Sequence, residues 1–483
     1  MNEPTLSKST SGSVYHIAVS IATTLLGLLR TVLLMRLLAP QAFGIVSLAL
    51  FFMTFVSPLA EFGIDSALIQ YKEPNRKTYA THFVLRLLFG VVVMGLGLMA
   101  APGLRRIYAH QTIMVDVFLA LLGINLFAST YATPAAILRK ELRFVALALL
   151  NLAASLAMTI TAPLLAYLGA GLWSLVAEQA IGPFVRWLGL WVLLRPWRLT
   201  LDFDGQWARS SLKFGGQVVF SNTLGVLLDR FDDFWTGSTL GATSLGYYSR
   251  AYEIAQYPER VLSTPIINVF FATYAALQKK PLELAKAVSR SSGFLIRAGF
   301  LLTLLLAVIA PELTMLLFGE TWLPIVPLFR LMLVYAMLDP LYANLCYLFV
   351  GVGRPDLLLR VRLLQVGLFI VAVVSLANLW GVNGVAIAAN LMMFSGTMLL
   401  FWQSHRFVHF SWRELMLTPA VATIGSGVIG LMLIRFVHWD NLWIGLLVKC
   451  AVIVSGYGLI LFLSEGSTLI VQARQLWSEM VGK

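Results

Sequence analysis

The chain has 483 residues, of which 59% are hydrophobic and only 12% charged, whereas soluble domains have about 45–50% and about 25%. This composition predicts an all-α integral membrane protein. The net charge of +12 is spread over short loops, as the positive-inside rule produces, so we expect no nucleic-acid partner. The two cysteines, Cys346 and Cys450, lie far apart in apolar segments, which argues against a disulfide framework or a cysteine metal cluster.

Apolar runs of about 20 residues, long enough to cross a hydrocarbon core of about 30 Å, follow one another along the chain. The first run is too long for a signal peptide, so we expect it to stay in the mature protein. We expect fourteen spans, at residues 13–38, 43–70, 79–99, 113–136, 144–168, 171–194, 214–236, 245–274, 293–317, 327–350, 357–380, 385–402, 415–437 and 442–463.

Lysine and arginine concentrate in alternate loops, which the positive-inside rule makes cytoplasmic. Both termini are then cytoplasmic, and Arg105 and Arg106 are the exception on the other side. The longest polar connectors, residues 195–213 and 277–292, are expected to form either amphipathic surface helices or plain tethers. Because all connectors are short, no soluble catalytic domain is predicted, and we do not expect an enzyme.

One bend occurs twice in the sequence. The stretch LLAPQAFGIVSLA, residues 37–49, is echoed by TLGATSLGYYSRA, residues 239–251. The copies lie six spans apart in the same orientation, as in the parallel repeats of transporters. We therefore expect two pseudo-symmetric six-helix lobes that rock against each other, residues 1–200 and 201–411. Residues 412–483 would form a final helix pair and a cytoplasmic tail.

Several ionisable residues fall inside the predicted spans, where each costs at least about 2.5–3.5 kcal/mol without a partner or a function. Arg30 lies at about two thirds of the depth of the first span, too deep to reach an interface easily, whereas Arg36 is close enough to its outer end to do so. Arg30 either binds an anion or forms an interhelical pair with Glu61 or Asp65.

The seventh and eighth spans carry further charges. Asp229, Asp232 and Asp233 form an acidic helix face, which indicates either a sodium or proton site or simple solvation near the helix end. Arg250 and Glu253 are three residues apart and are candidates for a local pair. No metal-ligand spacing, catalytic triad or nucleotide loop is visible, so we expect neither a metal nor another cofactor apart from a coupling ion.

The stretches LLRTVLLMRLLAPQAFGIVSLAL, AEFGIDSALIQ, STLGATSLGYYSRAYEIAQYP and FFATYAALQ give the chain its family likeness. It resembles the polysaccharide transporters of the multidrug, oligosaccharidyl-lipid and polysaccharide flippase superfamily, most of all exporters of the colanic-acid and teichuronic-acid type. The resemblance implies transfer of an undecaprenyl-pyrophosphate-linked oligosaccharide across a bacterial inner membrane by alternating access, with membrane lipid and polysaccharide polymerase or export proteins as partners.

The resemblance also suggests site residues. Arg30 and Arg36 resemble the first-helix arginines of lipid II flippases, and Arg250 is a looser match to an arginine on their eighth helix. Together with Arg86 they are the candidate pyrophosphate ligands. The candidate acidic or coupling residues are Glu61, Asp65, Asp229, Asp232 and Asp233, with Asn378 or Asn390 beside the last three.

Three other functions compete with this one. A multidrug exporter shares the predicted lobes, but usually has an acidic, aromatic-lined pocket. A lipid II flippase differs from the favoured interpretation only in its substrate. A membrane polymerase or ligase would require a large extracytoplasmic loop, and the outer loops here are short.

Overall fold

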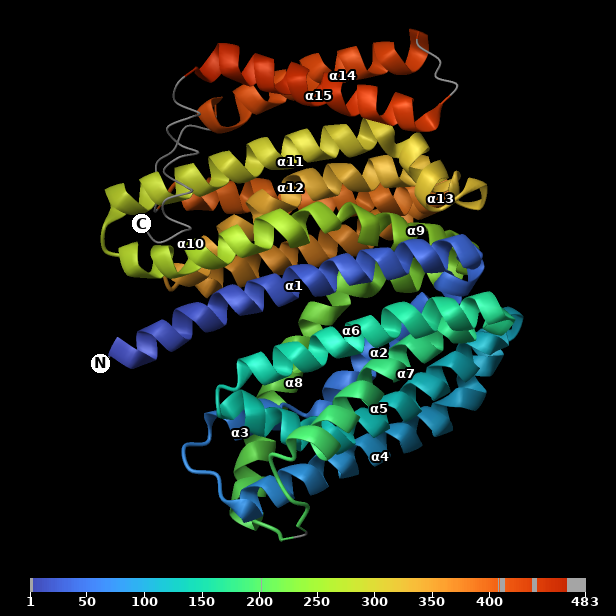
Figure 1. Ribbon diagram of the computed structural model, residues 1–483, viewed down its shortest axis with the longest axis vertical. Coiled ribbons are helices and arrows are strands. Elements are labelled where there is room, and N and C mark those ends of the chain that lie inside the picture. The colour runs from blue at the N-terminus through green and yellow to red at the C-terminus, as the bar shows by residue number, and fades with distance from the viewer. Residues whose placement is uncertain (1–2, 201, 407, 409–412, 437–440, 467–483) are drawn as a thin grey trace. The chain divides into compact units, whose positions relative to one another are not determined.

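The structure is a computed structural model that describes residues 3–200, 202–406, 408, 413–436 and 441–466 (Figure 1). These residues form helices and connecting turns without any strand, which confirms the all-α class. Ten of the described helices are long and apolar enough to cross a membrane. The count of fourteen spans stays a prediction.

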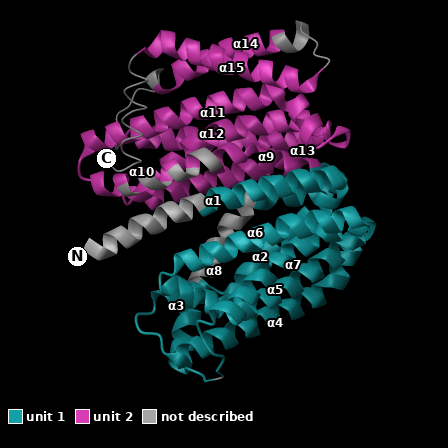
Figure 2. Ribbon diagram, viewed as in Figure 1, with its two compact units in different colours: residues 1–246 teal, residues 247–483 magenta. Residues whose placement is uncertain are grey.

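The chain divides into two compact units, residues 1–246 and 247–483 (Figure 2). The first unit contains α1 (Glu3–Leu37), α2 (Pro40–Glu61), α3 (Ile64–Gln70), α4 (Arg76–Ile107), α5 (Thr112–Lys140), α6 (Phe144–Leu165), α7 (Trp173–Leu188) and α8 (Gly205–Trp235). Short helical turns at Ala109–Gln111, Ala166–Ala170, Gly189–Leu194 and Thr236–Leu240 follow α4, α6, α7 and α8.

The division between the units falls within α9 (Ala242–Ala255). The second unit continues with α10 (Thr264–Leu277), α11 (Pro281–Leu317), α12 (Ile325–Gly351), α13 (Pro355–Ser404), α14 (Thr418–Phe436) and α15 (Leu442–Glu465). Short helical turns occupy Glu259–Ser263, Glu320–Trp322 and Arg413–Leu417. The lobe boundaries predicted from the repeat, after residues 200 and 411, stay a prediction.

The predicted span 43–70 is two helices, because the backbone turns left-handed at Phe62 and Gly63, with φ of 46° and 62°. Glycine adopts such a φ without the steric penalty that other residues meet. Gly215 of α8 packs directly on this break, since a β-carbon there would lie 1.9 Å from the carbonyl oxygen of Phe62. The break therefore separates α2 from α3 at a place where α8 supports it.

One other predicted span is also divided differently, whereas one predicted boundary coincides with a break in the helix. Residues 245–274 form α9, a π-helical turn and α10 rather than one helix. Residues 357–380 and 385–402 lie in α13, whose backbone leaves helical geometry at Trp380 and Gly381, the boundary between the two predicted spans. Apolarity alone gave no signal for the division of residues 245–274, because it continues through a bend whose cause is local backbone geometry.

Within the first unit, α1 packs along α6, and α6 packs in turn on α7, while α2 contacts α4, α5 and α8. Within the second unit, α12 packs between α11 and α13, and the hairpin of α14 and α15 packs on α11. The core of this second unit contains a buried polar group formed by Tyr274, Ser291, Ser292 and Asn344. Tyr274 donates to the Asn344 amide oxygen at 2.9 Å, and Asn344 donates to both serines. These bonds satisfy side chains that would otherwise be costly to bury.

The two long polar connectors differ. Residues 195–200 and 202–204 form no helix, so the first connector is a tether up to α8. Trp197 fixes it by packing against Ala80 and Ile137, and Asp204 caps α8 by accepting hydrogen bonds from the backbone of Gln206 and Trp207. The second connector is helical from Pro281 onward and continues into α11.

The repeated bends contact each other. A β-carbon on Gly44 of α2 would lie 1.7 Å from the carbonyl oxygen of Ala242, and one on Gly246 of α9 would lie 1.9 Å from that of Pro40. Each copy of the bend thus places a glycine against the backbone of the other copy. The glycine shared by the two sequence stretches is explained by this close approach.

We expect Gly44→Ala to destabilise the protein by at least about 1–3 kcal/mol, because the added methyl overlaps backbone rather than a movable side chain. The measurement is the thermal unfolding midpoint in detergent micelles. Gly95→Ala in α4 is the matched control, since no atom lies within 4 Å of its new methyl. Equal unfolding temperatures for Gly44→Ala and wild type would contradict the close approach.

Candidate functional site

Arg30 of α1 forms an ion pair with Glu178 of α7, with its Nε 2.8 Å from the carboxylate Oε1. The side chains are 15% and 14% exposed, and the Nη1 of Arg30 is buried without a hydrogen-bond partner. The alternative expectation of a partner at Glu61 or Asp65 is therefore wrong. Arg30 meets Glu178 instead because of how the helices pack: α1 lies along α6, and α6 packs on α7.

Arg36 lies exposed in the last turn of α1. A cation in this turn interacts favourably with the partial negative charge of the helix C-terminus. It is six residues from Arg30, so the two side chains leave the helix about 120° apart. Arg30, by contrast, is largely buried and is paired with an acid on another helix.

Arg86 belongs to a separate, buried cluster at the break between α2 and α3. Its Nη1 donates to the carbonyl oxygen of Ala60 at 2.9 Å, and its Nε lies 3.2 Å from Asp65. His82 Nε2 approaches the same carboxylate at 3.3 Å, and the other ring nitrogen is hydrogen-bonded to Thr133. The engagement of Arg86 with groups that define the helix break favours a structural role.

Two further predicted residues, Glu61 and Arg250, lie on α2 and α9. Glu61 is exposed at the end of α2. Arg139, in the last turn of α5, reaches within 3.9 Å of Asp65. Arg250 of α9 pairs with Glu253 on the same helix, as the spacing of three residues predicts.

The acidic face of α8 is not a solvated one. Asp232 and Asp233 are 7% and 6% exposed, and Asp233 accepts from Arg230 at 2.9 Å. The solvation interpretation is wrong for these two residues, because α8 packs on other helices where an open end was expected. The side chain of Asp229 lies outside the described residues. In the second unit, Asn390 donates to the carbonyl oxygen of Leu331, and Asn378 is exposed.

In the part of the chain that the structure describes, no group of three or more histidine, cysteine or acidic residues could hold a metal ion. Sodium or proton coupling stays a prediction.

Sequence reasoning missed two ion pairs that attach α15 to α11. Arg297 donates to both oxygens of Glu465, at 3.0 and 2.8 Å, and Lys449 pairs with Glu312. Tyr457 adds a hydrogen bond to the carbonyl oxygen of Arg297. The available signal was the presence of isolated charges in these apolar helices, Arg297 and Glu312 in α11 and Lys449 and Glu465 in α15. Their pairing could not be read from the sequence, because the partners belong to distant segments.

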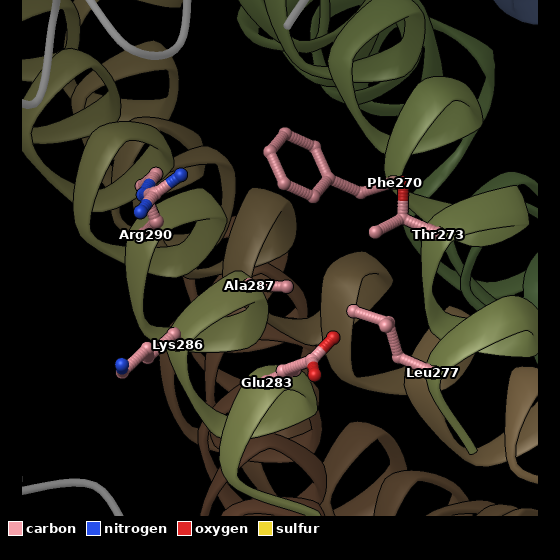
Figure 3. A pocket seen from close by; sticks show the side chains of 7 residues that line it. All are labelled: Phe270, Thr273, Leu277, Glu283, Lys286, Ala287 and Arg290. Atoms are coloured by element: carbon pink, nitrogen blue, oxygen red, sulfur yellow. The ribbon is translucent and has the colours of Figure 1, made fainter. Parts of the chain in front are cut away.

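A pocket of about 380 Å³ opens between α10 and α11 (Figure 3). Glu283 is directed into the space between the helices, whereas Lys286 is directed away from it. Because Lys280 pairs with Glu283 at 3.2 Å, the acid does not contribute an unbalanced charge. The pocket therefore presents a mixed lining rather than a clear anion or cation site.

A second hollow, of about 540 Å³, lies in the first unit between α2, α4, α5 and α8. Its lining is almost wholly apolar and includes Phe51, Phe52, Phe55, Phe118, Phe231 and Phe234. It offers no polar group that could recognise a head group. The charged pair of Arg30 and Glu178 remains the best candidate for recognition of an anion.

We expect Lys449→Met to destabilise the second unit by about 3–5 kcal/mol, because it leaves Glu312 without its buried partner. Lys280→Met is the matched control, since its lysine is 63% exposed and such surface pairs contribute at most about 1 kcal/mol. Thermal unfolding in detergent measures both. If Lys449→Met unfolds at the temperature of Lys280→Met, the pair does not hold α15.

Known proteins share both the fold and the sequence pattern. The structure is similar to "Lipid II flippase MurJ, inward closed conformation", with a TM-score of 0.75 and 14% identity, covering 94% of this chain and 100% of that one. It is also similar to an inward-facing multidrug resistance MATE family transporter of the MOP superfamily, with a TM-score of 0.61 and 16% identity over 82% and 98% of the two chains. These likenesses establish the transporter fold.

Sequence relatives are more specific. "Lipopolysaccharide biosynthesis protein WzxC" of Escherichia coli (strain K12) is 24% identical over 82% of this chain and 80% of its own. "Succinoglycan biosynthesis transport protein ExoT" of Rhizobium meliloti (strain 1021) is 25% identical over 67% and 65%. The family model described as "Polysaccharide biosynthesis protein" matches residues 33–327, more than half of the chain. The chain is a multi-pass membrane protein that belongs to this polysaccharide biosynthesis family.

Proposed function

We propose that the chain is a flippase that transfers a lipid-linked oligosaccharide, built on undecaprenyl pyrophosphate, across the cytoplasmic membrane of a bacterium. The proposal rests on the position and bonding of Arg30. This arginine lies in a membrane-spanning helix with one buried donor unused, in a chain whose relatives are named for polysaccharide biosynthesis and transport.

The chemistry of the substrate explains why such a residue is useful. A sugar and pyrophosphate head group cannot cross hydrocarbon without a polar path, whereas its polyprenyl tail can remain in the lipid. An arginine binds phosphate oxygens through two parallel, charge-assisted hydrogen bonds. Arg30 would hold the pyrophosphate during alternating access, with Arg36 and Arg250 as further candidate ligands.

The membrane potential can drive the step. Outward movement of two negative charges across about 100 mV contributes roughly 4–5 kcal/mol, at about 2.3 kcal/mol per charge. No nucleotide is required by this scheme. Coupling to sodium or protons, cytoplasmic termini, and contact with polymerase or export proteins are further parts of the proposal.

The test is the level of undecaprenyl-pyrophosphate-linked glycan in the inner leaflet of cells that lack the protein. We expect the glycan to accumulate in the deletion strain, to fall to the normal level when wild type is restored, and to stay high with Arg30→Ala. Arg30→Lys should restore only part of the transfer, because lysine keeps the charge without the bidentate geometry.

Arg105→Ala is the matched control, because Arg105 pairs with Asp116 and both side chains are about half exposed. It should restore transfer fully at the same membrane level of protein. A deletion strain that accumulates no such glycan and still exports its surface polysaccharide would exclude this substrate. Accumulation of lipid II in its place would favour the peptidoglycan precursor, and loss of drug resistance would favour drug export.

A further inference from the structure

The pair of Arg30 and Glu178 is electrically neutral as it stands. Its two charges are 2.8 Å apart and largely removed from water, so their fields cancel for any approaching ligand. An anion therefore gains little from Arg30 while the carboxylate stays in place. Strong binding of a pyrophosphate requires the carboxylate to move away.

We propose that Glu178 is a displaceable counter-ion of Arg30: a pyrophosphate group takes its place on the guanidinium, and the returning carboxylate expels that group after transfer. This inference rests on the proposed function. It assigns to Glu178 control of how tightly the substrate is held and how quickly it is released. Glu178 acts through Arg30 and is in that sense a positioning residue.

The geometry of the arginine suits an exchange of anions. Glu178 occupies the Nε side of the guanidinium, while the buried Nη1 has no hydrogen-bond partner. A guanidinium carries five N–H donors in a rigid fork that matches two phosphate oxygens. Once alternating access opens this buried site, an incoming phosphate can use the vacant donor and replace the carboxylate at Nε.

The surrounding helices can retain their packing when the pair opens. Thr159 of α6 donates to the carbonyl oxygen of Leu26 on α1 at 3.3 Å, and Arg186 of α7 donates to Asn151 of α6 at 3.0 Å. α1 and α7 are thus each attached to α6 by contacts that do not involve Glu178. Exchange at Arg30 does not require either helix to detach.

Two other arginine pairs of the first unit, those of Arg86 and Arg105, have different surroundings. Arg86 is tied to both Ala60 and Asp65, and Asp65 is also approached by His82, so displacement would disrupt a larger cluster. Arg105 and Asp116 are about half exposed, so water screens their charges. Arg30 combines a low-dielectric position, a single acidic partner on another helix and an unused donor.

The experiment measures binding of undecaprenyl pyrophosphate to the full chain in nanodiscs, with inorganic pyrophosphate and undecaprenol as separate arms. Inorganic pyrophosphate tests the anion without a lipid, and undecaprenol tests the lipid without an anion. We expect Glu178→Gln to bind undecaprenyl pyrophosphate about tenfold more tightly than wild type. In proteoliposomes it should release and transfer a fluorescent undecaprenyl-pyrophosphate disaccharide about tenfold more slowly.

A structural role for Glu178 would instead weaken binding and slow transfer together, and this result would overturn the inference. Asp116→Asn is the matched control and should change neither quantity. Arg30→Gln should lose the binding, and the double variant Arg30→Gln with Glu178→Gln should not regain it. Unchanged affinity in Glu178→Gln, with binding still lost in Arg30→Gln, would also overturn the counter-ion role and leave the proposed flippase intact.

Failure of the proposed function has a different signature. Equal binding of undecaprenyl pyrophosphate and undecaprenol, or unchanged binding in Arg30→Gln, would remove the anion site itself. Glu178→Asp covers the case in which the glutamine variant does not fold. Aspartate keeps the charge but is one methylene shorter, so the affinity for undecaprenyl pyrophosphate should rise above that of wild type, though less than complete loss of the counter-ion would raise it. An affinity at or below that of wild type would count against displacement.

Discussion

The interaction on which this structure depends is the pairing of opposite charges in a medium that does not solvate them. A charged side chain near the middle of a bilayer is costly, and an acid or base close by removes most of that cost. The helices of this protein meet the constraint at particular points. Arg30 meets Glu178, Arg86 meets Asp65, Arg297 meets Glu465, and Lys449 meets Glu312. Each pair also specifies which helices lie side by side, since an apolar surface alone has no such selectivity in lipid.

Most of the helical content could be predicted from apolarity, because a span needs about 20 apolar residues and the chain supplies them repeatedly. The break between α2 and α3 could not be predicted in the same way. The turn at Phe62 and Gly63 depends on a left-handed backbone that α8 supports through Gly215, and no hydropathy signal marks it. The repeated bend was different, because its glycine recurs in both copies and the structure places the two glycines in mutual backbone contact.

The candidate site was predictable to a similar, partial degree. A single arginine deep in an apolar helix is visible in the sequence, and so is the local pair of Arg250 and Glu253, whose partners lie one helical turn apart. The partner of Arg30 was not visible, because it depends on the packing of α1, α6 and α7. For the same reason Arg86 looked equivalent to Arg30 in the sequence, although the structure ties it to the α2 break.

Pairs of the same chemical type can therefore serve different purposes in one membrane protein. A pair built into a larger cluster, as Arg86 and Asp65 are with Ala60 and His82, holds helices together, and opening it disrupts several contacts at once. A pair with an unused donor has another option, since an incoming anion can be bound before the original acid is released. Arg30 has that unused donor, and its acid sits on a helix with its own attachment to α6. Transport requires both capture and release, and a neutral pair that an anion can open provides the two steps with one arginine.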